Sequence, residues 1–320
     1  MKALVLHGIG DLRFEEMPAP EPGPGEVLIR VVACGVCGSD IPRIFEKEAY
    51  RYPLICGHEF SGLVTACGAG VDDLEKDAGV TAFPLVWCGN CPACERGRYA
   101  QCSHYDYLGS RSNGAFAEYV VAPRRNILRI PERVPMEVAA MTEPAAVALH
   151  ALYRAGGLSA GETAAIFGAG PIGLMTAQWA ELSCMGKVIL FDVDPDKCAL
   201  ARRLGFRYCF NTAETSAPEV IDDMTGGEGA DIVIEAAGAP AALTSCLEVA
   251  GTGARIVLLG NPTSDVTLPA PLLSRAMRRE LSILGSWNST YSALGTRGEW
   301  QVVLQSMAAS ALMFSPLISH

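Results

Sequence analysis

The feature that most constrains the fold of this 320-residue chain is a glycine-rich segment in its second half, Gly168-Ala169-Gly170-Pro171-Ile172-Gly173. The segment follows the apolar run 163–167 and opens a stretch, 171–182, that has the composition of a helix. Gly168 permits a tight turn, Gly170 lets backbone amides approach a pyrophosphate, and Gly173 lets the helix pack closely against the strand. The sequence therefore predicts a strand, a phosphate-binding turn and a helix at this point.

From about residue 155 onward, short apolar runs alternate with helical stretches. The apolar runs are 163–167, 188–191, 208–210, 232–234, 255–259 and 281–284. A proline, which the first position of a helix tolerates, opens each of the clearest helical stretches, 171–182, 195–204, 240–250 and 271–279. Six strands alternating with helices predict an α/β fold with a parallel, doubly wound sheet.

The first half of the chain has a different composition and hydrophobic pattern. Residues 1 to about 154 are rich in proline, glycine and short β-like runs such as 27–34 and 116–122. The stretch 18–24 holds four prolines in seven residues, which neither a helix interior nor a central strand tolerates. These two different patterns predict two domains, and a chain of this length is long enough for about two domains.

The charge balance excludes one class of function. The chain has 25 Lys and Arg against 35 Asp and Glu, a net charge of −10, and it contains no basic run. Such a chain is not suited to a polyanionic backbone, so we expect no nucleic-acid partner. The two long uncharged stretches, 163–180 and 300–319, are interrupted by glycine or by polar residues. With no signal peptide evident at the start, we expect a cytoplasmic protein with no membrane span.

An acidic residue follows the second strand of the α/β half. Asp192 ends the run 188–191 and lies nineteen residues beyond Gly173. A carboxylate at this position can accept hydrogen bonds from the adenosine ribose and would repel a 2′-phosphate, so we predict NAD rather than NADP. The alternative is an acidic residue in an ordinary βα turn. The predicted NAD-binding residues are Gly168, Gly170, Pro171, Ile172, Gly173, Asp192 and Lys197.

Four of the twelve cysteines lie within fifteen residues in the spacing Cys88-x2-Cys91-x2-Cys94-x7-Cys102. Four thiolates at this spacing can close a tetrahedral shell around Zn²⁺ and leave no open position, which is typical of a structural zinc site. An iron–sulfur cluster and disulfides are the alternatives. The scattered cysteines Cys184, Cys198, Cys209 and Cys246 are interpreted as small core residues.

A second metal-binding set is dispersed along the first half. Cys37, His58 and Glu143 offer one thiolate, one imidazole and one carboxylate, which form a three-ligand zinc set with a fourth position open for water or substrate. The alternatives are that His58 is a core histidine and that Glu143 simply precedes a helix beginning at Pro144.

The order of these motifs resembles a known family. The segment Gly57-His58-Glu59-x2-Gly62-x5-Gly68-x2-Val71 is similar to the zinc signature of the medium-chain alcohol and polyol dehydrogenases. The four-cysteine lobe, Glu143-Pro144, His150, the glycine motif and Asp192 follow in that family's order. The resemblance implies a β-rich GroES-like catalytic domain at 1–154, to which 288–320 returns, and a Rossmann NAD-binding domain at 155–287.

The resemblance also implies roles. Cys37, His58 and Glu143 would hold the catalytic zinc, with Glu59 a ligand in some states, and Ser39 would take the substrate proton. Zinc stabilises negative charge on an alcohol oxygen while a hydride passes to the nicotinamide. With the cysteine lobe this makes two zinc ions per chain. Family likeness further implies a homodimer or homotetramer in which the strand 281–284 pairs across a two-fold axis.

Several segments resemble the branch of the family that oxidises sugar-alcohol phosphates, namely 37–45, 57–62, 109–111, 116–119 and 285–287. A phosphorylated substrate needs cationic anchors, for which Arg43, Lys47, Arg51 and above all Arg111 are candidates. Tyr50 and Trp287 are expected to line the substrate pocket beside the polyol chain. The remaining hypotheses are a dehydrogenase of an unphosphorylated polyol or of threonine, and a zinc-containing binding protein without catalysis.

The sequence differs from the family pattern in three features. Pro42 stands where many relatives have a proton-relaying histidine, so the proton must leave by another route. Residues 75–79 replace a common Pro-Gly-Asp turn. The sequence stops at His320, before the last helix and strand of relatives, so either it is truncated or its catalytic domain is less closed.

Overall fold

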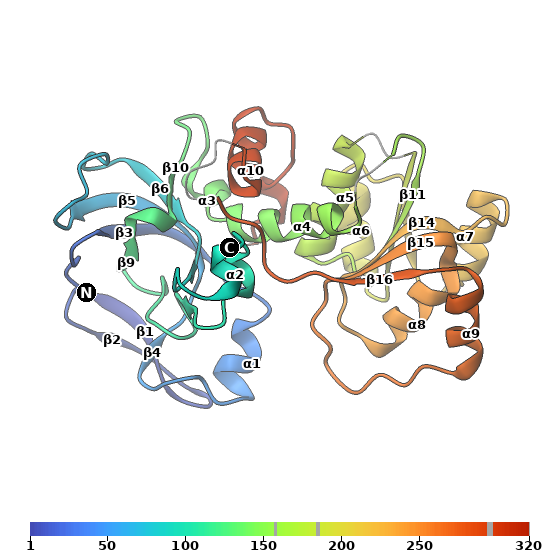
Figure 1. The fold of residues 1–320 in the computed structure, drawn as a ribbon, viewed down its shortest axis with the longest axis horizontal. Helices are drawn as coiled ribbons and strands as arrows, with labels where there is room; N and C mark the ends of the chain where they lie inside the picture. The colour runs from blue at the N-terminus through green and yellow to red at the C-terminus, as the bar shows by residue number, and fades with distance from the viewer. Residues whose placement is uncertain (157–158, 184–185, 293–296, 320) are drawn as a thin grey trace. The chain divides into compact units, whose positions relative to one another are not determined.

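The structure is a computed structural model that describes residues 1–156, 159–183, 186–292 and 297–319 (Figure 1). The chain forms two compact units, of which the first comprises Met1–Ala146 with Ser289–His320 and the second Val147–Asn288. The division falls inside helix α4 (Thr142–Arg154), eight residues before the position that the sequence pattern indicates. Within the described ranges, no helix is both long and apolar enough to cross a bilayer.

The first unit is built on antiparallel sheets. Its main sheet has the order β10-β6-β5-β3-β9 and encloses an apolar core that includes Val27, Ile29, Phe60 and Val120. The strands of that sheet are β3 (Glu26–Gly35), β5 (Glu59–Cys67), β6 (Gly79–Ala82), β9 (Tyr119–Pro123) and β10 (Ile127–Arg129). The smaller sheets join β2 (Asp11–Glu16), β1 (Lys2–Gly8) and β4 (Leu54–Ile55), and β7 (Leu85–Val86) with β8 (Asp106–Tyr107).

Short helices complete this unit, and its last segment returns to it after the second unit. The helices are α1 (Asp40–Phe45), α2 (Pro92–Glu95), α3 (Met136–Ala139) and α10 (Glu299–Ala308). Trp300 of α10 is fully buried, with its ring edge-on to Phe83 at 5.5 Å between centroids. Tyr291 stacks on Phe83 at 4.7 Å and donates its hydroxyl to the Arg125 carbonyl at 2.8 Å. These contacts fix the returning segment through buried aromatic area.

The second unit is the predicted α/β domain. Its six parallel strands have the order β13-β12-β11-β14-β15-β16, which is a doubly wound sheet and confirms the predicted fold class. The strands are β11 (Thr163–Phe167), β12 (Lys187–Asp192), β13 (Tyr208–Asn211), β14 (Ala230–Glu235), β15 (Ala250–Leu258) and β16 (Ser282–Gly285). The strand order reverses between β11 and β14, so a crevice for a ligand is expected at the carboxyl ends of these two strands.

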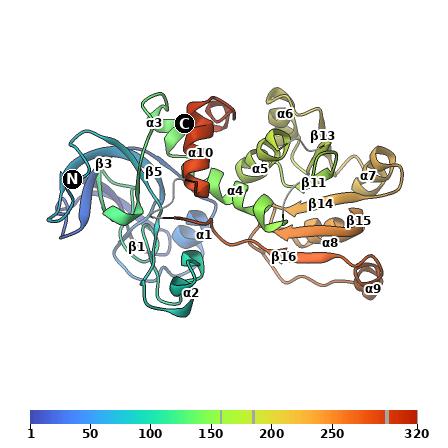
Figure 2. The same cartoon turned by 45° about the horizontal axis from the view of Figure 1, so that its top comes forward.

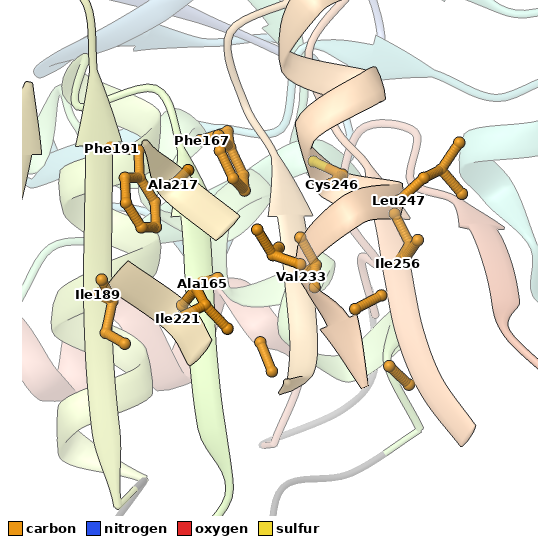
Figure 3. Close-up of a cluster of buried hydrophobic side chains, with 14 of the residues drawn as sticks. Ala165, Phe167, Ile189, Phe191, Ala217, Ile221, Val233, Cys246, Leu247 and Ile256 are labelled. Atoms are coloured by element: carbon orange, nitrogen blue, oxygen red, sulfur yellow. The ribbon is translucent and has the colours of Figure 1, made fainter. Parts of the chain in front are cut away.

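Helices cover both faces of this sheet. Side chains of three helices pack against one face in a cluster that includes Phe167, Phe191, Ile221 and Leu247. Figure 3 shows buried residues of this cluster, which come from the sheet and from two of these helices. The helices of that face are α7 (Ala217–Thr225), α8 (Pro240–Val249) and α9 (Ala270–Arg278), while the opposite face carries α5 (Pro171–Leu182) and α6 (Pro195–Arg203) (Figure 2).

The scattered cysteines behave as expected where the structure describes them. Cys198, Cys209 and Cys246 are buried, and Cys184 lies outside the described residues.

Candidate functional site

Three of the predicted ligand residues converge where β3 ends and its antiparallel partner β5 begins. Cys37 follows β3, while His58 precedes and Glu59 opens β5, and the antiparallel pairing places Glu59 opposite Gly35. One ligand atom from each of Cys37, His58 and Glu59 lies within 4.8 Å of the other two. A sulfur, an imidazole nitrogen and a carboxylate oxygen at this separation can share one ion, as zinc sites with an open position require.

Two glycines make this convergence possible. A Cβ added at Gly35 would lie 2.4 Å from Oε2 of Glu59, so only glycine lets this carboxylate lie against β3. Gly57 has a φ of +89°, a left-handed conformation, and an added Cβ there would meet the Phe116 ring at 2.4 Å. Gly35 and the first glycine of the zinc signature, Gly57, therefore shape the backbone around His58 and Glu59.

A buried carboxylate that the sequence analysis did not select lies beside the imidazole ring of His58. Asp40, the first residue of α1, lies with Oδ1 3.7 Å from Nδ1 of His58, and this nitrogen makes no hydrogen bond among the described residues. Arg43 donates to Oδ1 of Asp40 at 2.6 Å and the Cys37 amide donates to Oδ2 at 3.1 Å. A carboxylate on one ring nitrogen orients a histidine whose other nitrogen binds metal.

The electrostatics of these residues fit a cation. Burial lowers the pKa of His58 to about 3, which leaves the imidazole neutral, as a metal ligand must be. Burial raises the pKa of Glu59 to about 7, and burial together with the charges of Glu59 and Glu143 raises the pKa of the Cys37 thiol. Burial and mutual repulsion make the charged forms of these acidic groups unfavourable. A bound cation would offset both costs, so the donor set suits zinc.

Glu143 lies beside this group. It belongs to the first turn of α4, is buried, and accepts a hydrogen bond from the Tyr107 hydroxyl at 3.3 Å on Oε1. Of the two carboxylates that the sequence analysis assigned to this zinc, Glu59 is thus the one within 4.8 Å of both Cys37 and His58. Tyr107 escaped the sequence analysis because no spacing relates it to Glu143.

Ser39 lies next to the sulfur ligand. Its hydroxyl is 3.4 Å and its amide 3.5 Å from Sγ of Cys37, and the residue is exposed. An exposed hydroxyl beside a ligand can exchange a proton with a bound alcohol and with solvent.

The four-cysteine lobe is compact. The sulfurs of all four residues lie within 4.8 Å of one another, with Cys91–Cys94 at 3.5 Å, Cys91–Cys102 at 3.9 Å and Cys88–Cys94 at 4.0 Å. Four sulfurs around one zinc with Zn–S bonds of about 2.3 Å stand roughly 3.8 Å apart. All four cysteines are free thiols, so the lobe fits a tetrahedral zinc and contains no disulfide.

The glycine turn in the second unit has the predicted close contacts. A Cβ at Gly173 would lie 1.8 Å from the Gly168 carbonyl oxygen, whereas one at Gly170 would meet nothing within 4 Å. Asp192, at the end of β12, accepts hydrogen bonds from the amides of Ala169 at 2.7 Å and Asp194 at 2.9 Å. The turn is thus packed on its inner side and open at Gly170, where a phosphate can approach.

Two further predicted residues, Lys197 and Trp287, belong to the second unit. Nζ of Lys197 is 3.9 Å from Asp192, and Trp287, which is 57% exposed, lines a cavity of about 240 Å³ with Glu235 and Leu258 at the carboxyl ends of β14 and β15. Glu235 is buried and accepts hydrogen bonds from the amides at 237 and 238.

Arg111 has an unusual environment in the first unit. Its guanidinium lies 4.1 Å from the ring centroid of Tyr50 and 4.4 Å from that of Tyr105, and its buried Nε lacks a partner among the residues described. Tyr50 remains 67% exposed. The two rings hold a cation with unused hydrogen-bond capacity, whereas Arg43 is engaged by Asp40.

Comparisons with known proteins agree with the geometry. Residues 23–132 match the alcohol dehydrogenase GroES-like domain and residues 171–309 match a zinc-binding dehydrogenase domain. The chain is 37% identical to galactitol 1-phosphate 5-dehydrogenase of Escherichia coli K12, covering 100% of this chain and 92% of that protein. It is 35% identical to sorbitol dehydrogenase of Bacillus subtilis 168, covering 86% and 79%.

Solved structures give the same result. The crystal structure of galactitol-1-phosphate dehydrogenase from Escherichia coli matches with a TM-score of 0.94 and 37% identity, covering 100% of this chain and 92% of that one. A zinc-binding dehydrogenase from Sinorhizobium meliloti 1021, bound to NADP, matches with a TM-score of 0.89 and 31% identity, covering 98% and 90%.

The chain therefore belongs to the zinc-dependent medium-chain alcohol and polyol dehydrogenases, oxidoreductases that act on CH–OH groups. This confirms the family resemblance of the sequence motifs. Within the family, the chain is similar over its full length to galactitol 1-phosphate 5-dehydrogenase.

The two ligand clusters predict two zinc ions per chain. Cys37→Ser is expected to lose one zinc and keep the other, and Cys102→Ser to lose the opposite one, as measured by elemental analysis of the purified chains. Cys67→Ser, a cysteine outside both clusters, is the matched control and should retain both. Full zinc content in Cys37→Ser would refute the catalytic set.

Proposed function

We propose that this chain is an NAD- and zinc-dependent dehydrogenase that oxidises a sugar-alcohol phosphate to the keto-sugar phosphate. The substrate we infer is galactitol 1-phosphate, with L-tagatose 6-phosphate as the product. The observation that carries the proposal is the convergence of Cys37, His58 and Glu59, with Asp40 behind the imidazole, in a chain that also has the glycine turn. The full-length similarity to galactitol 1-phosphate 5-dehydrogenase supports the choice of substrate.

Cys37, His58 and a carboxylate from Glu59 or Glu143 would hold the zinc. When bound, zinc supplies Lewis-acid stabilisation of negative charge on the substrate oxygen, and NAD accepts the hydride. Asp40, with Oδ1 3.7 Å from Nδ1 of His58, is close enough to favour the imidazole orientation that would leave its other nitrogen for the ion. Ser39 takes the hydroxyl proton of the substrate, and its exposure allows that proton to leave to water without a relay through Pro42.

NAD rather than NADP is the cofactor that the second unit favours. Both oxygens of Asp192 are fixed by backbone amides, so a 2′-phosphate would meet a carboxylate that cannot turn away. The NADP-bound Sinorhizobium protein indicates that family membership alone does not decide this preference. The preference for NAD is therefore assigned to Asp192 itself.

The phosphate of the substrate would be bound by Arg111. Its turn is anchored beside the metal ligands, because a Cβ at Gly109 or Gly114 would lie 2.4 or 2.1 Å from the Gly57 carbonyl oxygen, next to His58. A guanidinium held between two aromatic rings loses little further freedom on binding an oxyanion. Arg111 is therefore better prepared for a phosphate than Arg43. The similarity to sorbitol dehydrogenase supports an unphosphorylated polyol as the second candidate.

We also propose that two copies pair through β16 to form a homodimer, with a homotetramer as the larger alternative. β16 is the last strand in the sheet order, and Ile283 on it is 47% exposed. On the adjacent helix α9, Leu273 is 47% and Met277 80% exposed. An apolar edge strand offers unpaired amides and carbonyls to a second copy.

Substitution of Arg111 tests the phosphate claim. Arg111→Gln is expected to lower kcat/KM for galactitol 1-phosphate by about 10- to 100-fold, the loss of charge-assisted hydrogen bonds, and to leave kcat/KM for free galactitol nearly unchanged. Initial rates of NADH formation measure both values. Arg98→Gln, an exposed arginine of the same unit, is the control. A wild-type chain that uses galactitol as well as its phosphate would contradict the phosphate claim.

Substitution of Asp192 tests the cofactor claim. The wild-type chain should prefer NAD to NADP, and Asp192→Asn should reduce this preference by about 10-fold or more because it removes the charge that repels a 2′-phosphate. Steady-state kinetics with both cofactors provide the measurement, and Asp196→Asn, an exposed acid on α6, is the control. Equal efficiency of the wild-type chain with NADP would overturn the assignment.

Substitution of Ile283 tests the dimer. Ile283→Lys places a charge on the proposed pairing edge and should convert the dimer to a monomer in sedimentation velocity at micromolar concentration. Val193→Lys changes an even more exposed aliphatic residue elsewhere in the second unit and should leave the dimer intact. A wild-type monomer at these concentrations, or a dimeric Ile283→Lys, would exclude pairing through β16.

A further inference from the structure

Tyr107 touches two of the residues assigned to the metal. Its hydroxyl donates to Oε1 of Glu143 at 3.3 Å, and its ring lies edge-on to the His58 imidazole with centroids 5.5 Å apart and planes at 72°. A phenol has one O–H donor and an ionised carboxylate only accepts, so the direction of this hydrogen bond is fixed. One side chain therefore restrains both a carboxylate and an imidazole of the site.

The backbone of Tyr107 is held as firmly as its side chain. The residue ends β8 and pairs with β7, where Leu85 is the partner of Tyr107. Its carbonyl oxygen accepts hydrogen bonds from the amides of Ser110 at 3.1 Å, Arg111 at 2.9 Å and Ser112 at 3.2 Å. The turn that carries Arg111 is thus built on the Tyr107 carbonyl.

The same turn is packed against the residue that precedes His58. The amide of Ala115 donates to the Gly57 carbonyl at 2.9 Å, and the glycines at 109 and 114 leave no room for a Cβ against that carbonyl. Tyr107 therefore contacts Glu143 and His58 through its side chain and the Arg111 turn through its carbonyl oxygen. These contacts connect the proposed metal ligands to Arg111.

We propose that Tyr107 is a positioning residue of the catalytic centre, which orients Glu143 and His58 toward the ion and fixes the Arg111 turn at a set separation from them. The inference rests on the metal site proposed above. Because the hydroxyl engages Oε1 of Glu143, Oε2 of this carboxylate would be left for the ion, while Glu59 has a ligand atom within 4.8 Å of those of Cys37 and His58. Loss of the hydroxyl frees Glu143 to rotate and weakens the zinc set.

The test is zinc release to a colorimetric chelator from the full chain. The wild-type chain should release two zinc ions at separable chelator strengths, and Cys37→Ser identifies which of them belongs to the catalytic set. Tyr107→Phe should weaken the Cys37-dependent zinc by about 10- to 100-fold, the usual effect of losing an outer hydrogen-bond partner. Zinc in the cysteine lobe should keep its wild-type affinity.

Tyr291→Phe is the matched control, because it also removes one tyrosine hydroxyl that is hydrogen-bonded within the first unit, at a place remote in sequence from the ligands. It should leave both zinc affinities unchanged even where it lowers stability. In a Glu143→Ala background, Tyr107→Phe should cause at most a small further loss of zinc affinity, since its partner is gone. Full additivity of the two changes would indicate a purely structural role.

The outcomes separate the two proposals. Wild-type zinc affinity in Tyr107→Phe, together with a normal Cys37-dependent zinc in the wild-type chain, would overturn the role of Tyr107 alone. A wild-type chain without a Cys37-dependent zinc would overturn the metal site and with it this inference.

Discussion

The central constraint in the first unit is a cluster of ionisable groups whose charged forms burial disfavours and which a bound cation would stabilise. Cys37, His58, Glu59 and Glu143 come from three separate stretches, and burial disfavours the charged form of each. The pairing of β3 with β5 and the glycines at 35 and 57 bring the first three groups together. A cation at this place would stabilise the thiolate and the carboxylates together, which is why we propose that the backbone is shaped for an ion.

Around this cluster, the chain uses partners that never touch the ion. Asp40 accepts hydrogen bonds from Arg43 and the Cys37 amide and lies 3.7 Å from Nδ1 of His58, while Tyr107 links Glu143 to the turn of Arg111. Outer hydrogen bonds of this kind set the direction of the ligands, and rigid ligands are what a reactive open-coordination site needs. In the second unit the same principle holds for Asp192, whose carboxylate is fixed by the glycine turn.

Much of this account follows from the sequence because local geometry fixes it. The glycine turn sits between a strand and a helix, and the strands expected at 163–167 and 281–284 occur at Thr163–Phe167 and Ser282–Gly285. The four lobe cysteines also lie close in sequence. Asp40 was within reach of the same reasoning, since it lies only three positions after Cys37, and its carboxylate accepts a hydrogen bond from the Cys37 amide just before α1. By contrast, Tyr107 meets Glu143 only through the β7–β8 pairing, which no spacing reveals.

Anomalous diffraction at the zinc edge, from crystals of the chain with NADH and the polyol phosphate, tests the central claim most directly. The account predicts a peak bounded by Cys37, His58 and a glutamate, and a second peak inside the cysteine lobe. A single peak, in the lobe alone, would contradict the claim that the buried cluster is built around an ion.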